Sequence, residues 1–336
     1  MKKTLIASAI AAATFASSSA FAMDPAAELA AKINSMPTVY GNIQLGYLNS
    51  ETDNGSTTTT TNSVFDNGST IGVKHSHEIA PGITGFLKME FDVDAVTSAT
   101  QFSTDEAYMG VKGDFGSVQF GSDDTVYEWV KVVPDEAIDL SYDDVAGVNE
   151  SNNFQYTSPK LAGMATVGVT LPTDASLNDE NHALALAVKA APVENLNVVL
   201  AYAMGREQGA LDTGDSIGLS AAYSMDNITV VGQFQKKSAN SVSGTDDKES
   251  DLTTFALRGT VALGANSLSL AYRTTATDAD TAGQKDTISG FWLQGMHNVS
   301  DNMYVYAEYV AETTEYKGSS ADTDVNTFAV GATYFF

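Results

Sequence analysis

The final ten residues of the chain alternate with a period of two. Every second position is apolar, in the order Phe328, Val330, Ala332, Tyr334 and Phe336. A membrane-spanning β-strand needs this pattern over about ten residues, because one face meets lipid and the other faces a lumen. We therefore expect the chain to end on a transmembrane strand.

The first residues predict export. Lys2 and Lys3 form a basic start, residues 5–15 an apolar stretch, and residues 20–22 (Ala-Phe-Ala) a cleavage site. Residues 1–22 are read as a signal peptide, with an uncleaved helical anchor as the alternative. No later run of about 18 apolar residues occurs, so any membrane crossing should use a closed barrel.

Composition narrows the class of protein further. The chain of 336 residues has no cysteine, so disulfides cannot stabilise it, and no long linker divides it into halves. Its 42 acidic residues against 17 lysines and arginines exclude nucleic acid as a partner. A generally acidic, soluble exported protein remains the alternative to a barrel.

Period-two segments recur along the whole chain, and we count about sixteen of roughly ten residues each. The clearest are residues 39–47, 87–93 and 165–171, and in the first two the face opposite the apolar one carries polar side chains such as Gln44 and Glu90. Short turns alternate with long polar connections, which include residues 50–67 and their threonine run. This alternation is the plan of outer-membrane barrels. Residues 291–297 are ambiguous, and Trp292 would suit an aromatic belt near a rim.

Two stretches resemble a known family. Residues 69–74 (STIGVK) with 85–90 (GFLKME) resemble a hairpin of the trimeric general porins of Gram-negative bacteria. Residues 104–121 (TDEAYMGVKGDFGSVQFG) resemble a second, more specific segment of that family. The resemblance covers essentially the whole mature chain. It implies an all-β, 16-stranded antiparallel barrel in the outer membrane, with a third loop that folds inward.

The resemblance also places the pore constriction. By position, the third loop is residues 123–150, the longest connection, in which Lys131 is the single base. Its expected constriction residues are Asp123, Asp124, Glu128, Asp135, Glu136, Asp139, Asp143 and Asp144. An acidic flap outside the barrel is the alternative reading.

Departures from the family are informative. Its members usually carry arginines on the wall that faces the third loop, and these positions correspond to Thr70, Asp105 and Gln155 here. Lys74, Lys88 and Glu90 complete the expected wall. Because carboxylates then outnumber bases, we expect a channel for passive diffusion of small hydrophilic solutes and ions that prefers cations.

The resemblance further implies a homotrimer that contacts outer-membrane lipid and lipopolysaccharide. Phe336 would be the signal read by the barrel assembly machinery. Glu106 is expected on a strand at the trimer contact, near the outward-facing Leu45, Met89 and Phe91.

Residues 23–37 precede the barrel, which we place at residues 38–336. The segment begins Met-Asp-Pro and is rich in alanine, which favours a short helix. A periplasmic tether, a pore plug and a contact with peptidoglycan or a partner all remain open.

No catalytic, metal or cofactor site is expected. The four histidines, His75, His77, His182 and His297, lie in no Gly-x-Ser-x-Gly or His-Glu-x-x-His context. His75 and His77 share a strand face and are read as rim residues, with metal binding as the weaker alternative. A substrate-specific oligosaccharide porin could use Tyr127, Trp129 and Tyr142 to stack sugars, and an adhesive barrel would have a blocked lumen.

Overall fold

The computed structural model describes residues 36–97, 102–131, 150–173, 184–205, 207–208, 211–212, 214–238, 251–277, 285–318 and 321–336. The predicted signal peptide and residues 23–35 of the N-terminal extension lie outside these residues. The strands are β1 (Thr38–Asp53), β2 (Thr58–Asp66), β3 (Thr70–Ala80), β4 (Ile83–Val93), β5 (Phe102–Gly113), β6 (Gly116–Ser122), β7 (Asn153–Thr157), β8 (Ala165–Pro172), β9 (Leu184–Val193), β10 (Leu196–Met204), β11 (Glu207–Gln208), β12 (Leu211–Asp212), β13 (Ser216–Met225), β14 (Ile228–Lys237), β15 (Leu252–Leu263), β16 (Asn266–Thr277), β17 (Lys285–Ser300), β18 (Met303–Tyr316) and β19 (Thr323–Phe335). A 3-10 helix, η1 (Val126–Val130), follows β6.

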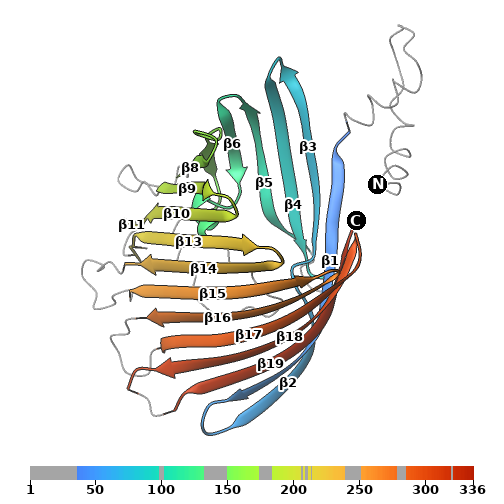
Figure 1. Cartoon of the computed structure of the whole chain (residues 1–336), viewed down its shortest axis with the longest axis vertical. Coiled ribbons are helices and arrows are strands. Elements are labelled where there is room, and N and C mark those ends of the chain that lie inside the picture. The colour runs from blue at the N-terminus through green and yellow to red at the C-terminus, as the bar shows by residue number, and fades with distance from the viewer. Residues whose placement is uncertain are drawn as a thin grey trace.

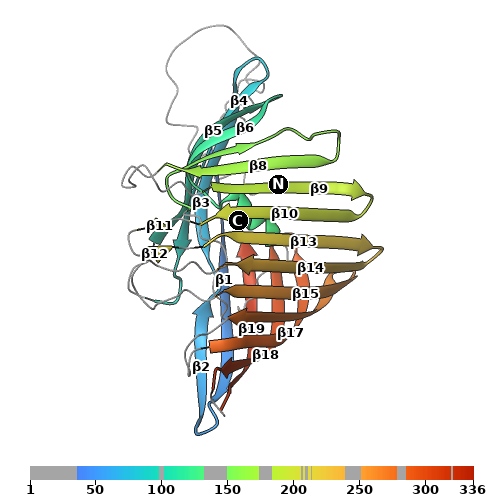
Figure 2. The ribbon, with the colours of Figure 1, turned by 90° about the vertical axis from the view of Figure 1, so that its left-hand side faces the viewer.

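The long strands form one closed antiparallel sheet (Figures 1 and 2). Seventeen strands belong to it, and β11 and β12 form a separate small pair. The first and last strands, β1 and β19, pair from Asn42↔Phe335 to Asp53↔Asp324. Figure 1 accordingly shows the C-terminus beside β1. Closure gives each long strand of the sheet two neighbours except β2, which pairs with β1 alone.

The barrel has sixteen strand positions, because β2 and β3 share one. Both pair with β1, β2 with its Leu45–Asp53 half and β3 with its Thr38–Asn42 half. The strand is interrupted between them at Gly68, whose φ is +86°, a backbone conformation that glycine adopts readily. There the Asp66 carboxylate accepts the backbone N–H groups of Gly68 and Ser69. The predicted 16-stranded antiparallel barrel is thus confirmed.

One expected loop is largely strand. Residues 50–67 were read as a long polar connection, but β1 and β2 form a hairpin that turns at residues 54–57. Asn54 Oδ1 accepts the N–H groups of Ser56 and Thr57 and so closes the turn. The threonine run lies mainly in exposed β2, because β-branched residues favour extended backbone. The expectation of a long polar connection over residues 50–67 was therefore wrong.

The two faces of the sheet differ as alternation requires. Large apolar side chains point outward and form an exposed belt across neighbouring strands, which includes Leu186, Leu200, Leu219, Phe234, Leu257, Leu270, Leu293, Tyr309 and Val330. In the final strand, outward Phe328, Val330 and Tyr334 are exposed, whereas Thr327 and Thr333 face inward. An apolar outer belt over a polar interior is the pattern of a membrane barrel.

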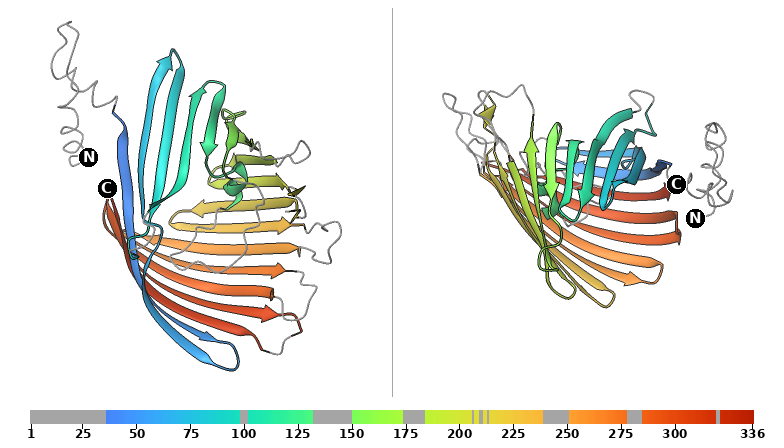
Figure 3. Two further views of the ribbon diagram at one scale, coloured as in Figure 1. Left: turned by 180° about the vertical axis from the view of Figure 1, so that it is seen from behind. Right: turned by 90° about the horizontal axis from the view of Figure 1, so that it is seen from above.

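The connections alternate in length, as predicted. Two-residue turns join β3 to β4, β5 to β6, β9 to β10, β13 to β14, β15 to β16 and β17 to β18, all at one end of the barrel. Most connections at the other end are longer. Figure 3 shows the barrel in two further views. Within the described part of the chain, no helix is long and apolar enough to cross a membrane.

Candidate functional site

A β-bulge concentrates carboxylates on the inner face of β4 and β5. Met89 pairs with Ala107 and Phe91 with Thr104, so Glu90 alone stands opposite both Asp105 and Glu106. A bulge of this kind breaks strict alternation and turns two consecutive side chains toward one side. Asp105 and Glu106 therefore both approach Glu90.

The three carboxylates are close together and share one lysine. Oxygen atoms of Glu90, Asp105 and Glu106 all lie within 4.8 Å of one another. The Lys88 ammonium lies 2.5 Å from Glu106 Oε2 and 3.7 Å from Glu90 Oε1. Two like charges at this spacing repel by roughly 1 to 3 kcal/mol between the dielectrics of water and of a protein surface. One lysine cannot neutralise three acids, so the cluster keeps a negative charge.

Glu106 is therefore not an outward-facing residue of a subunit contact. The resemblance placed Glu106 on a strand at the trimer contact near outward-facing residues, whereas its own side chain lies on the inner face. The bulge supplies the extra residue that reverses the orientation of Glu106, and its side chain pairs with the inward-facing Lys88.

The start of the third loop brings further carboxylates to the same wall. Asp123 follows β6, accepts a hydrogen bond from Gln119 Nε2, and donates its backbone N–H to the Glu150 carbonyl oxygen across the base of the loop. Burial, and then the negative charge of Glu106, raise the pKa of Asp123 to about 6. Asp124 is a further source of negative potential at Asp123. Loop and wall thus contribute to one acidic region.

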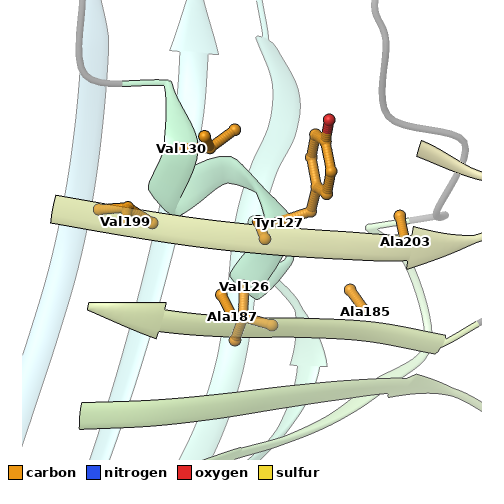
Figure 4. Close-up of a cluster of buried hydrophobic side chains, with 8 residues drawn as sticks. Val126, Tyr127, Val130, Ala185, Ala187, Val199 and Ala203 are labelled. Carbon is orange, nitrogen blue, oxygen red and sulfur yellow. The ribbon is translucent and has the colours of Figure 1, made fainter. Parts of the chain in front are cut away.

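The next residues attach the loop to the inside of the barrel. Val126, Tyr127 and Val130 of η1 are fully buried against small residues on β9 and β10, among them Ala187 and Val199 (Figure 4). The Val126 N–H also donates to Thr170 Oγ1 on β8, over 3.0 Å. The inward-facing Gly168 leaves room for η1, since a Cβ there would lie 2.5 Å from the Trp129 ring. The described start of the third loop therefore lies inside the barrel.

The expected wall residues occupy different environments. Thr70 lies on the inner face and accepts a hydrogen bond from Asn42 Nδ2 over 3.1 Å. Gln155 is also inward but is 9 % exposed, and its Oε1 accepts a hydrogen bond from Thr170 Oγ1 beneath η1. Lys74 lies over the Tyr40 ring, 4.8 Å from its centroid. Glu128 pairs with Lys131 over 2.5 Å. The predicted loop residues Asp135, Glu136, Asp139, Asp143 and Asp144 lie outside the described residues.

The opposite wall of the barrel carries arginines whose position was not predicted from the sequence. Counting sixteen positions around the sheet, β15 is eight positions from β5 in either direction. The guanidinium of Arg258 on β15 donates to Ser269 Oγ over 3.0 Å and to Gln294 Oε1 over 3.2 Å. Arg273 on β16 lies 5.0 Å from the centre of the Trp292 ring. Trp292 is inward and 2 % exposed, so it belongs to no aromatic belt. Acidic and basic groups thus face each other across the barrel.

Two clusters contain side chains of the types that ligate metals, but we assign neither of them as a metal centre. Glu90, Asp105 and Glu106 offer three oxygen ligands, but the Lys88 ammonium already bonds to the cluster. His77 Nδ1 lies 3.1 Å from His75 Nε2 on the exposed outer side of β3, and the two rings offer only two ligands. Structural zinc sites need four ligands.

Comparisons with known proteins agree with this architecture. A family model described as Gram-negative porin matches residues 7–315. A relative from Halomonas sp., named "Monosaccharide porin", and one from Halomonas elongata, named "Major outer membrane protein", are each 28 % identical over the full length of both chains. An anion-selective porin from Comamonas acidovorans superposes with a TM-score of 0.75 at 16 % identity, covering 90 % of this chain and 99 % of that one. OmpT of Vibrio cholerae, described as a trimer form, gives 0.65 at 16 % identity, with 90 % and 99 % covered.

Proposed function

This chain belongs to the family of Gram-negative porins, and from that premise we propose that it is a general diffusion channel that prefers cations. The family match and the relatives identify this chain as an outer-membrane porin, and a porin is a channel. The finer proposal is passive diffusion of small hydrophilic solutes and ions through the barrel lumen.

One observation carries the cation preference. Within the described residues, the bulge brings Glu90, Asp105 and Glu106 within 4.8 Å of one another, and the single lysine bonded to them is Lys88. A surplus of carboxylates on a pore wall lowers the energy of a passing cation and raises that of an anion. At 16 % identity, the anion selectivity of the Comamonas porin does not transfer to this chain.

The third loop is proposed to narrow the pore. Its described start is held against β8, β9, β10 and β13 by η1, inside the barrel. Asp123, Asp124 and Glu128 would then contribute to the constriction. The same role is proposed for the five loop acids from Asp135 to Asp144.

The decisive experiment combines two measurements on the purified protein in bilayers. Reversal potentials in a potassium chloride gradient at low salt should show cation preference, and the preference should shrink in molar salt, where the screening length is about 3 Å. Liposome swelling with neutral sugars of graded size should show a smooth decline with size. Anion selectivity at low salt would contradict the cation proposal while leaving the channel intact.

A homotrimer in contact with lipid and lipopolysaccharide is also proposed. The exposed apolar belt needs lipid or a subunit against it, and the Vibrio cholerae neighbour is described as a trimer form. Phe336 is proposed as the residue that the assembly machinery reads. Native mass spectrometry after gentle detergent extraction tests the oligomer, because a population of monomers alone would exclude it.

A second candidate function is selective passage of a sugar, because one relative is named a monosaccharide porin. Trp129 borders a cavity of about 310 Å³ together with Thr166, Lys189 and Asn197, so an aromatic ring and polar groups lie together there. Tyr127 is fully buried and is not available for stacking. Tyr142 lies outside the described residues. A sugar that blocks single-channel current at micromolar concentration, with loss of block in Trp129→Ala, would support this function over the general channel.

A further inference from the structure

Below the acidic cluster, toward the turn end of the barrel, a second region of the wall has the opposite charge. Lys74, Lys88 and Lys112 border one cavity of about 380 Å³, together with Thr38, Ser76 and Tyr108. In register, Lys74 pairs with Lys88, and Lys112 pairs with Thr84, four residue pairs closer to the turns. The cavity thus lies on the turn side of Glu90.

Aromatic rings hold two of these lysines in place. Lys74 Nζ lies 4.8 Å from the centre of the Tyr40 ring, and Lys112 Nζ lies 5.8 Å from that of Phe86. Such distances are typical of cation–π contacts, which restrain the side chain without neutralising its charge.

Each ring is in turn seated on a glycine. A Cβ on Gly72 would lie 2.5 Å from Tyr40 Cζ, and a Cβ on Gly110 would lie 2.6 Å from Phe86 Cζ. Any other residue would therefore displace the ring and the lysine above it. The arrangement of glycine, ring and lysine thus occurs twice, and both of its lysines line this cavity.

The two restrained lysines have no carboxylate within ion-pair distance among the described residues. Lys88, by contrast, pairs with Glu106 and Glu90. Glu78 lies on the same rung as Lys112, two strands away, and its Oε1 accepts the N–H of Gly82 over 3.0 Å. The chain has 42 acids and 17 bases, so two lysines held without an acid partner are unexpected from composition.

We propose that Lys74 and Lys112 form a binding subsite for small dianions, either phosphate or a short dicarboxylate, at the turn-side mouth of the channel. Each ammonium offers donors to an anionic oxygen, and the hydroxyls of Thr38 and Ser76 border the same space. The subsite is reached through the proposed channel and does not depend on its cation preference. It would retain dianions at one mouth of a pore whose acidic cluster repels them.

The test uses the purified full-length mature protein in planar bilayers with potassium chloride. Phosphate and succinate are added in separate experiments, at pH 8, to one side at a time. Each anion should reduce the open-channel current more strongly from the turn side than from the loop side. The double substitution Lys74→Gln/Lys112→Gln should raise the half-blocking concentration by at least about tenfold, since each lysine loses a charged hydrogen bond.

Lys236→Gln is the control, because it removes the same charge from a lysine that lies at the loop end of β14, pairs with Asp251 over 3.3 Å and does not border this cavity. It should keep the block. Equal block of the unmodified and double-substituted channels, or no block by either anion, would overturn the subsite while leaving the channel intact. If the double variant fails to insert, Lys74→Arg/Lys112→Arg should keep the block. In detergent, phosphate or succinate should also raise the melting temperature of the unmodified protein, and an absent shift counts against the subsite.

Discussion

The ammonium of Lys88 lies 2.5 Å from Oε2 of Glu106, a residue that the family resemblance placed on a strand at the trimer contact. The bulge in β5 accounts for this pair, because it adds one residue opposite Glu90. Lys88 thereby offsets part of the charge of the acidic cluster. Removing the charge of Lys88 and removing that of Glu106 should therefore shift the ion selectivity of the channel in opposite directions.

Glu106→Gln should lower the cation-to-anion permeability ratio, and Lys88→Gln should raise it. A unit charge several ångströms from the ion path in water changes this ratio by roughly two- to fivefold. Reversal potentials at low salt measure both changes. Glu315→Gln is the control, because Glu315 is exposed on the outer side of β18. A shift of the same sign in the two lumen variants would contradict the assignment.

Arginines at the family positions should weaken or reverse the preference. Thr70 and Asp105 both lie on the inner face, so Thr70→Arg/Asp105→Arg should move the potassium chloride reversal potential toward zero or past it. Gln155→Arg should behave differently, because Gln155 is nearly buried and bonded to Thr170 beneath η1. A charge there should lower the melting temperature instead. An unchanged reversal potential in the double variant would show that the selective carboxylates lie elsewhere.

Acidification should reduce the cation preference with a midpoint near pH 6. Burial and the nearby Glu106 raise the pKa of Asp123 to about 6, so its carboxyl is charged at pH 8 and mostly neutral at pH 5. The lumen then loses negative charge as the pH falls. Reversal potentials between pH 8 and pH 5 test this, and Asp123→Asn should show a smaller change over that range. A variant that titrates like the unmodified channel would exclude Asp123.

Gly168→Val should detach η1 from the barrel wall. A Cβ at this position would lie 2.5 Å from the Trp129 ring and 2.7 Å from Val126 Cγ1. We expect more conductance substates and a larger limiting solute size, with the barrel still folded, because valine suits a strand. Gly232→Val is the matched control, since its Cβ would meet no atom closer than 3.9 Å. Identical single-channel records for the two variants would argue against η1 as the anchor of the loop.

The seam between the chain ends should be sensitive to the terminal residue. Phe336 and Gly41 exchange two backbone hydrogen bonds of 3.1 and 3.2 Å, and a Cβ on Gly41 would lie 2.7 Å from the Phe336 ring. Deletion of Phe336, or Gly41→Val, should reduce the fraction of folded barrel seen as a heat-modifiable band in gel electrophoresis. Gly259→Val, where a Cβ meets no atom within 4 Å, should fold normally. Normal folding without Phe336 would exclude its role in closing the barrel.

Much of the fold could be predicted because barrel strands carry their orientation in local alternation. The outward Phe328, Val330 and Tyr334 and the sixteen positions followed from period-two patterns and from turn residues. The position of the third loop followed from its place in the order of strands. These features depend on near neighbours in the sequence.

The sequence by itself therefore determined the class of the barrel, its two faces and the acidic content of its third loop. Only the tertiary structure decided that Glu106 points inward, that Trp292 lies in the lumen, and that Arg258 stands eight strands from β5. One extra residue in a strand reverses every later side chain, and the sequence does not mark where the partner strand permits that slip. Which residues face each other across the lumen depends on closure of the whole sheet, which joins strands far apart in the chain.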